Sequence, residues 1–219
     1  VSYVNERATA TQQTGFWFVA QARPWNPADM GILWFGVDDA ATSCLTPIFC
    51  SAQEVPGCFR EDNGSMLEYS PTSAFWLFNR TTNFAYMRYD MISADIRKVT
   101  DKWENDMLRN VQALNARVGK MSPEARRSHL TQLSVETAQQ LFDRWQRLNN
   151  YLLVKYMDGN VKSEHAGVLE YLDGKGGPAH FVDNGNGKQI PDKIQFPGYN
   201  EKWKRAVAAD NGEVLKVID

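Results

Sequence analysis

The chain has 219 residues, of which 43% are hydrophobic and 23% are charged, a composition typical of a globular domain with its own core. Basic residues number 24 and acidic residues 26, so the net charge is -2 and there is no basic field to hold nucleic acid or an anionic membrane. No run of apolar residues approaches the roughly 18 that a membrane span needs. The sequence therefore predicts neither a nucleic-acid partner nor a membrane span.

The first part of the chain, residues 1–60, is predicted to be rich in strands. Short aromatic and β-branched runs, broken by proline, glycine and aspartate, predict strands over 14–22, 31–37 and 43–50. The prolines between the first two runs suit a hairpin with a wide loop. Because the runs are almost continuously apolar, we expect helices or a second sheet to cover both faces of the sheet they form.

The middle of the chain, residues 70–158, is predicted to be helical. Apolar residues spaced by three and four predict a largely buried helix over 72–91 and an amphipathic helix over 93–118. Ser122 followed by proline and an acidic residue is a helix start. The helix that begins there would end near residue 157.

That last helix would have about 35 residues, and a break near Ser134 is an equally good interpretation of the pattern. Since no heptad repeat is sustained, we expect a helical hairpin packed on a sheet rather than a coiled coil.

After Gly159 the chain becomes rich in glycine and proline, which predicts a loop-rich tail over 159–219. Within this tail the pattern favours a short helix at about 200–209 and a final strand at 214–218. The sequence has no internal repeat, and residues 1–219 are predicted to form a single α+β unit.

The three cysteines, Cys44, Cys50 and Cys58, lie close together in the sequence, and because their number is odd they cannot all pair with one another. One disulfide and one free thiol are possible. A thiolate nucleophile at Cys44 or Cys50 would need a neighbouring cation or base, and nothing local in the sequence supplies one. No spacing of cysteines and histidines fits a metal site, so no metal and no cofactor is predicted.

Two charged features follow predicted strands. Asp38 and Asp39 are adjacent, so their side chains would point to opposite faces of a strand, and we expect a turn or cap rather than a catalytic pair. Arg23 comes directly before Pro24 at the end of the first strand. A fixed guanidinium can hold a carboxylate by two bonds or stabilise an oxyanion. Arg23 is therefore the candidate catalytic residue, and a solvated or salt-bridged arginine is the alternative.

Several strings, met in order along the chain, resemble the C-terminal part of dipeptidase A family enzymes, which are bacterial cysteine-type N-terminal-nucleophile hydrolases. They are QQTGFWFVAQ at 12–21 followed by Arg23, LWFGVDD at 33–39, VPGCF at 55–59, SAFWLFN at 73–79, NFAY at 83–86 and VKYMDGN at 154–160. The resemblance implies an αββα sandwich, of which this chain is the C-terminal portion, with strands first and long helices after.

The resemblance also implies the chemistry. In such enzymes an amino-terminal cysteine attacks the peptide carbonyl while its own α-amine acts as base. That cysteine lies well upstream of Val1 in family members, and Val1 has no thiol to replace it. The expected function is hydrolysis of dipeptides or short peptides by the complete protein, with this segment inactive alone. Arg23 is the candidate for the arginine that related amide hydrolases place near the nucleophile.

The expected partners are a dipeptide or short-peptide substrate, the missing N-terminal part, and a further copy of the chain if an apolar edge is left uncovered. The alternatives are a non-catalytic α+β binding or structural module, and a self-contained cysteine hydrolase that uses Cys44 or Cys50. An exposed apolar sheet edge favours the first interpretation and a reactive thiol favours the third. A periplasmic or secreted location is favoured over a cytoplasmic one because clustered cysteines suit it.

Overall fold

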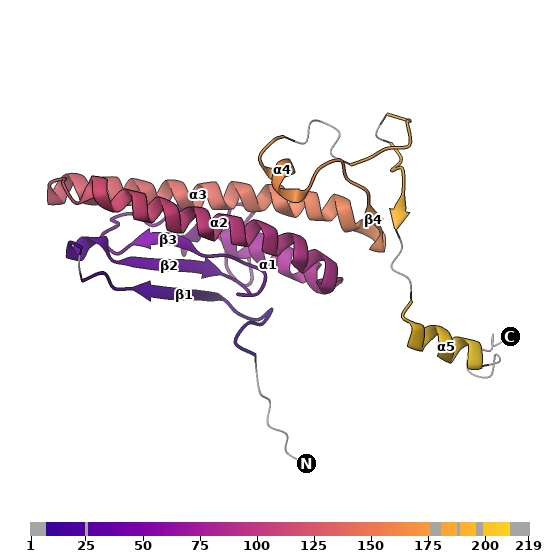
Figure 1. Cartoon of the computed structure of the whole chain (residues 1–219). Coiled ribbons are helices and arrows are strands. Elements are labelled where there is room, and N and C mark those ends of the chain that lie inside the picture. The colour runs from indigo at the N-terminus through magenta and orange to yellow at the C-terminus, as the bar shows by residue number, and fades with distance from the viewer. Residues whose placement is uncertain (1–7, 25, 176–180, 188, 196–198, 211–219) are drawn as a thin grey trace, which may run out of the picture.

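The chain folds into a three-stranded sheet followed by three long helices and a tail (Figure 1). The computed structural model describes residues 8–24, 26–175, 181–187, 189–195 and 199–210. The helices and strands, in chain order, are β1 (Phe16–Gln21), η1 (Ala28–Met30), β2 (Ile32–Val37), β3 (Thr46–Phe49), η2 (Gly57–Phe59), α1 (Ala74–Tyr86), α2 (Tyr89–Val118), α3 (Pro123–Tyr156), η3 (Met157–Gly159), β4 (Val161–Lys162), α4 (Val168–Leu172), β5 (Ile194–Gln195) and α5 (Glu201–Ala209). The α+β class predicted from the sequence, with strands preceding long helices, is confirmed.

The sheet is antiparallel, with strands in the order β1-β2-β3, and each strand is shorter than its apolar run. β1 ends before Pro24, and β2 starts after the turn of η1. Proline has no N–H to give to a β-ladder, so the proline-rich segment between these two strands stays outside the sheet.

The two faces of the sheet differ in what covers them. Paired residues share a face, and Trp34 lies opposite Pro47 on the face against the helices, where both are buried. Leu33 lies opposite Ile48 on the other face, where both are only partly buried. The helices therefore cover one face of this sheet.

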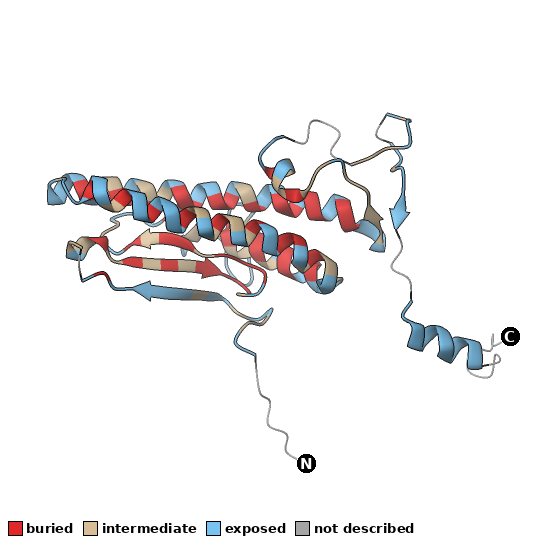
Figure 2. Ribbon diagram, in the orientation of Figure 1, coloured by how far each residue is buried: buried red, intermediate tan, exposed pale blue. Residues whose placement is uncertain are grey.

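β1 is the least covered strand, as its exposed residues in Figure 2 show. Phe16, Phe18 and Val19 are 61%, 54% and 52% exposed, and the strand lies on the side of the sheet away from the helices (Figure 1). The expectation that both faces of every strand are covered is therefore wrong for β1. The strand is apolar, as the sequence predicts, but within the described residues no second layer packs on it.

The boundary between the first two helices differs from the prediction. α1 ends at Tyr86 rather than Met91, and α2 begins at Tyr89 rather than Ser93. The helix is interrupted at Arg88, because its φ of -151° and ψ of 61° are not helical. Continuous apolar spacing hid this break.

α3 runs without interruption for 34 residues, so the alternative break near Ser134 is not present. The hydroxyl of Ser134 donates to the carbonyl of Leu130 (2.8 Å) and accepts from the backbone N–H of Phe49 (3.1 Å). A serine that would disturb an isolated helix is satisfied here by its contact with β3. α2 and α3 form the predicted helical hairpin on the sheet.

The core lies between the helices and one face of the sheet. Phe78 of α1 stacks on Trp145 of α3 with ring centroids 4.4 Å apart, and both side chains are buried. The apolar faces of the amphipathic helices are buried in this core. None of the helices in the described part of the chain is both long and apolar enough to cross a membrane.

The tail holds short elements that its composition did not predict, namely the paired strands β4 and β5 and the short helix α4. The predicted helix at 200–209 is confirmed as α5, where the side chain of Asn200 accepts from the backbone N–H of Trp203 (2.8 Å). The strand predicted at 214–218 lies outside the described residues.

Candidate functional site

Arg23 follows β1 and is buried, with 8% of its surface exposed. Its guanidinium donates to the carbonyl of Met30 (3.3 Å) and to the side-chain oxygen of Asn115 in α2 (2.5 Å). Burial lowers the pKa of Arg23. Both partners are neutral, and the Nε has no hydrogen-bond partner among the described residues.

These contacts bear on the role predicted for Arg23. The solvated strand-end arginine is excluded by its burial, and no salt bridge to Arg23 is formed within the part of the chain that the structure describes. What remains is a buried cation that is held by η1 and α2 and whose Nε has no partner among the described residues. That arrangement can place a positive charge rigidly near the end of β1.

Asp38 follows β2 in a left-handed turn, with φ at 68°, a conformation that costs a residue other than glycine free energy. Its carboxylate is fully buried and accepts hydrogen bonds from Asn79 (2.8 Å) and from the hydroxyl of Thr82. Burial raises the pKa of Asp38, although these two hydrogen bonds act in the opposite direction. The strained turn is therefore held by α1.

Asp39 binds separate partners. Its carboxylate accepts from the hydroxyl of Tyr86 (2.8 Å) and from the backbone N–H of Ala41 (2.9 Å). Burial and the neighbouring Asp39 carboxylate raise the pKa of Tyr86 to about 12. The two aspartates tie the end of β2 to α1 and do not converge on one point, which agrees with the turn role expected for them.

All three cysteines have free thiols, so the disulfide considered from the sequence is not formed. Cys44 and Cys58 are buried and Cys50 is exposed. Burial raises the pKa of the Cys44 thiol and raises that of Cys58 to about 12, so both stay protonated at neutral pH. Cys44 is therefore excluded as the nucleophile of a self-contained hydrolase.

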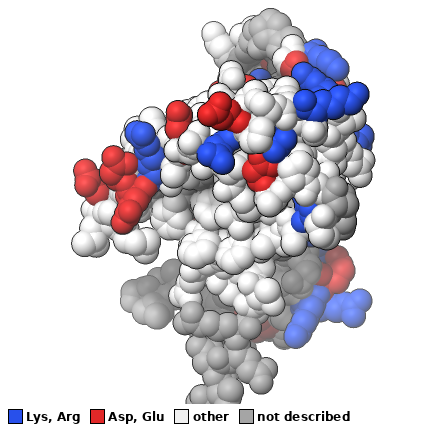
Figure 3. Space-filling view, turned by 90° about the vertical axis from the view of Figure 1, so that its left-hand side faces the viewer, with Lys and Arg blue, Asp and Glu red and all other residues white. Residues whose placement is uncertain are grey.

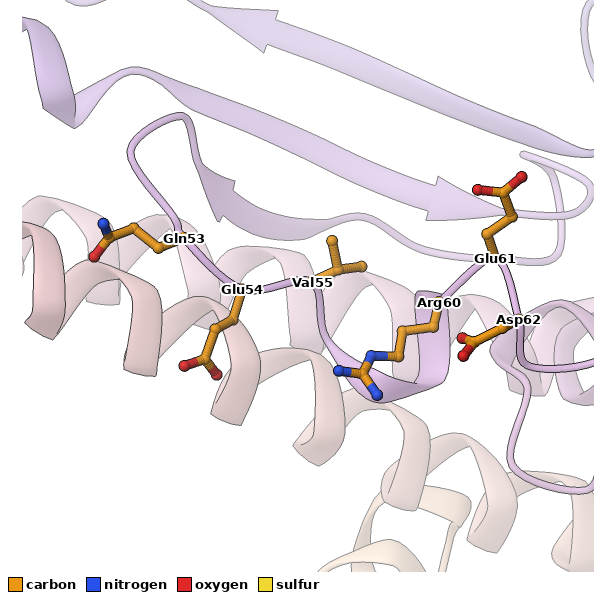
Figure 4. Close-up of a pocket in the computed structure, with 6 residues that line it drawn as sticks. All are labelled: Gln53, Glu54, Val55, Arg60, Glu61 and Asp62. Atoms are coloured by element: carbon orange, nitrogen blue, oxygen red, sulfur yellow. The ribbon is translucent and has the colours of Figure 1, made fainter.

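Two adjoining cavities lie at the loop that follows β3, and the smaller one is also lined by residues of the sheet. The larger, of about 710 Å³, is lined by Gln53, Glu54, Val55, Arg60, Glu61 and Asp62 (Figure 4). The smaller, of about 300 Å³, shares Gln53, Glu54 and Val55 and is otherwise mostly apolar. The sequence did not predict these cavities, because the lining residues come from a loop and from partly buried strand positions.

A row of aromatic rings continues from the smaller cavity across the sheet. Phe59 meets Phe35 edge to face at 5.1 Å, Phe35 lies 6.1 Å from Phe16, and Phe16 lies 6.5 Å from Phe18. Seen from one end in Figure 3, charged side chains gather mainly in the upper part of the molecule, with a further group at the lower right. An apolar sheet surface of this kind marks a place where another protein segment or a ligand packs.

A second group of charges lies between α2, α3 and the tail. The ammonium group of Lys155 contacts Asp95 (2.7 Å) and Glu164 (3.2 Å), and the hydroxyl of Tyr156 donates to Asp95 (2.7 Å). Burial alone would raise the pKa of Asp95, but the hydrogen bonds from Lys155 and Tyr156 outweigh it and hold the pKa below its ordinary value. This network joins the helices to the tail, and none of its residues lines either cavity.

The described residues contain no group of three or more histidine, cysteine, aspartate or glutamate side chains that could hold a metal ion. The charged residues of the larger cavity include three carboxylates, but these do not form such a group. The charges and the shape of the two cavities therefore indicate what they can bind.

Comparison of the sequence with family models shows both the class of protein and the family that it resembles. Residues 2–102 match a model of peptidases, which supports a peptidase function for the chain. The model is that of Peptidase family C69. The matched stretch extends from before β1 into α2, and includes the sheet, Arg23, the aspartate turn and both cavities. Over residues 2–102 the chain thus matches the dipeptidase A-like peptidases of family C69, which confirms the resemblance inferred from the strings in that stretch; the string at 154–160 lies outside it. None of the curated proteins matches the chain.

Proposed function

We propose that this chain is the C-terminal portion of a dipeptidase whose cysteine nucleophile lies on another segment of the same protein. The observation that carries the proposal is the uncovered strand β1, with Phe16 and Phe18 more than half exposed beside the two cavities. A stable sheet does not leave such a strand open, because its unpaired edge and apolar face invite another strand or layer.

The edge of β1 can be defined from the hydrogen bonds of the sheet. The backbone N–H of Asp38 donates to the carbonyl of Gly15 (3.0 Å), so these two residues form a hydrogen-bonded pair. Such pairs alternate along an antiparallel ladder. The backbone groups of Phe16, Phe18 and Ala20 therefore point away from β2. We propose that a strand of the N-terminal part binds this edge and that its sheet packs on the aromatic row.

In the proposed enzyme the sulfur of the missing cysteine attacks the carbonyl carbon of the scissile peptide bond, and the cysteine α-amine takes the thiol proton. The α-ammonium group then gives this proton to the leaving amine as the C–N bond breaks, and water hydrolyses the resulting thioester to the carboxylic acid and the free thiol. The described residues would contribute the sheet, its covering helices and part of the substrate pocket. Exclusion of Cys44 as a nucleophile supports this division of roles. Cys50 is exposed, and it stays the one alternative thiol in this chain.

Arg23 is proposed as the arginine near that nucleophile. The support is its burial and its unused Nε donor, which a developing oxyanion or a substrate carboxylate could engage. Arg23→Lys keeps the charge and loses the planar fork, and Arg23→Ala loses both. In a protein that includes the upstream segment, dipeptide turnover should fall in both variants. Intact turnover in Arg23→Ala, with the fold preserved, would remove Arg23 from the mechanism.

The non-catalytic module is the weaker candidate, since a self-sufficient module has no reason to leave β1 uncovered. Dipeptide hydrolysis separates the two. We expect no turnover by the 219-residue chain and measurable turnover by the chain joined to its upstream gene sequence. Turnover by the chain alone would direct attention to Cys50, whereas inactivity of both proteins would favour the module.

A further inference from the structure

A third cavity lies where the loop after η2 meets the start of α1, and its volume is about 220 Å³. Residues of the loop and of the helix start line it, among them Arg60, Met66, Ser73, Phe75 and Trp76. The volume is below the range typical of drug-sized ligands and equals that of roughly seven water molecules. The cavity therefore suits an ion with at most one small group attached.

Ser73 has an unused hydroxyl at this cavity. The residue stands at the N-cap position of α1, but its side chain makes no capping hydrogen bond and has no other partner in the described part of the chain. Only 7% of the surface of Ser73 is exposed. Ser122, at the same position of α3, does accept from the backbone N–H of Ala125 (3.3 Å). A mostly buried hydroxyl without a protein partner is available to a ligand.

The first turn of α1 adds further donors. Three backbone N–H groups have no acceptor among the described residues, those of Ala74, Phe75 and Trp76. The first hydrogen bond of the helix runs from the N–H of Leu77 to the carbonyl of Ser73 (3.2 Å). The free groups carry the positive end of the helix dipole, and the first turn contains no acidic side chain to neutralise it. This helix start therefore attracts an anion.

Arg60 brings a positive side chain to the same cavity. It is the one charged residue among the described residues that line the cavity, and it forms no ion pair within the described ranges of the chain. The carboxylates of Glu61 and Asp62 line only the larger cavity. Arg60 lines both cavities and is exposed, so its long side chain can turn from one to the other. A guanidinium binds an oxyanion by two parallel hydrogen bonds.

The loop is held in place before any ligand binds. The side-chain oxygen of Asn63 accepts from the hydroxyls of Ser70 (2.5 Å) and Thr72 (2.9 Å). The indole N–H of Trp76 donates to the carbonyl of Glu68 (3.0 Å). These bonds fix the loop to the start of α1. A preformed site loses little conformational entropy when it is filled.

We propose that this cavity binds a single phosphate or sulfate group at the start of α1. The N–H groups of the first turn and the hydroxyl of Ser73 donate to its oxygens, and Arg60 neutralises its charge. A tetrahedral oxyanion presents acceptors in several directions at once, which matches donors from three sources. Phe75, Trp76 and Met66 form an apolar wall beside the group, where one small ring fits. The site is additional to the proposed peptidase function and does not depend on it.

The test is a titration of the 219-residue chain, observed through the backbone amide signals of residues 73–76 by NMR. The probes are sodium sulfate, sodium phosphate and phenyl phosphate, with sodium chloride at equal ionic strength as the control. We expect saturable shifts with the three oxyanions and none with chloride. Affinity for phenyl phosphate about five-fold above that for inorganic phosphate would assign the site to a small ester, and equal affinity would assign it to the free ion.

Variants separate the donors from the fold. Ser73→Ala should weaken sulfate binding by about ten-fold, because a hydrogen bond to a charged acceptor is lost. It should leave the urea midpoint unchanged, since the hydroxyl makes no capping bond. Arg60→Gln should weaken sulfate binding by about five-fold.

Ser122→Ala is the matched control. It removes the cap of α3, so it should lower the urea midpoint without changing the affinity for sulfate. Shifts that chloride reproduces, no shift at residues 73–76, or unaltered sulfate affinity in both Ser73→Ala and Arg60→Gln would overturn the proposal.

Discussion

At the scale of single residues, Asp38 combines burial, a left-handed backbone and two side-chain hydrogen bonds. Asp38→Ala removes the acceptor of the Asn79 amide and one of the two hydroxyl partners of Thr82, which keeps Thr42, and lost buried hydrogen bonds are costly. We expect the free energy of unfolding to fall by about 2 kcal/mol, measured by urea denaturation. Asp38→Asn keeps an acceptor oxygen and should lose less. An equal loss in both variants would mean that the charge, and not the hydrogen bonding, holds the turn.

The cysteines give a second prediction at this scale. Iodoacetamide should modify Cys50 in the folded chain at neutral pH, because its side chain is exposed. Cys44 and Cys58 should react only after unfolding, since burial keeps their thiols protonated and out of reach. Peptide mapping by mass spectrometry reads the three sites separately. Rapid modification of Cys44 in the native protein would contradict its exclusion as a nucleophile.

How far the sequence predicts such residues depends on what surrounds them. The turn role of Asp38 and Asp39 followed from the two-residue period of a strand. The burial of Arg23 did not, because it depends on Asn115, which is far away in the sequence and near in the fold. The cavity residues from Gln53 to Asp62 had no signal of their own apart from the string at 55–59. Loop residues gain a role through tertiary placement, which no local pattern reports.

At the scale of elements, the link between α2 and α3 through Asp95 and Lys155 makes a pH-dependent prediction. The pKa of Asp95 is lower in the folded than in the unfolded chain, where it has its ordinary value of 3.8. The stabilisation is therefore present above about pH 4 and is lost as the pH falls through the folded pKa. The free energy of unfolding of the chain should therefore lose this contribution as the pH is lowered below about 4.

Asp95→Asn isolates the component. At pH 7 the variant should be less stable by about 3 kcal/mol, because it leaves a buried lysine with one carboxylate fewer. The gap to the unaltered chain should narrow as the pH falls below 3.8, the ordinary pKa of aspartate. Asp106→Asn, which breaks more exposed pairs on α2, should cost less than about 1 kcal/mol. A gap that stays constant with pH would show that the charge of Asp95 is not what stabilises the helices.

Element types and order were predictable because apolar periods of two and of three to four are long and consistent here. Boundaries were less so. The break at Arg88 occurs inside a continuous apolar pattern, and the alternative break near Ser134 is absent because β3 satisfies the serine hydroxyl. Both differences come from contacts or backbone angles that the period does not contain. The tail elements β4, α4 and β5 are too short to produce a period at all.

At the scale of the whole molecule, the distribution of covered and uncovered surface is the most informative feature. The helices bury one face of the sheet, and the aromatic row of Phe59, Phe35, Phe16 and Phe18 remains on the other beside the two cavities. An apolar strand pattern could indicate two covered faces but could not say which chain segment covers the second. We propose that an N-terminal part of the same protein covers it.

Hydrogen exchange at β1 tests this most directly. The N–H groups of Phe16, Phe18 and Ala20 point away from β2, whereas those of Trp17 and Val19 point toward it. In the 219-residue chain alone, the first three should exchange rapidly and the other two slowly. When the chain is joined to its upstream segment, the first three should slow by at least about ten-fold, with little change in the others. Equal and rapid exchange of these three amides in both proteins would contradict the proposal that the N-terminal part completes this sheet.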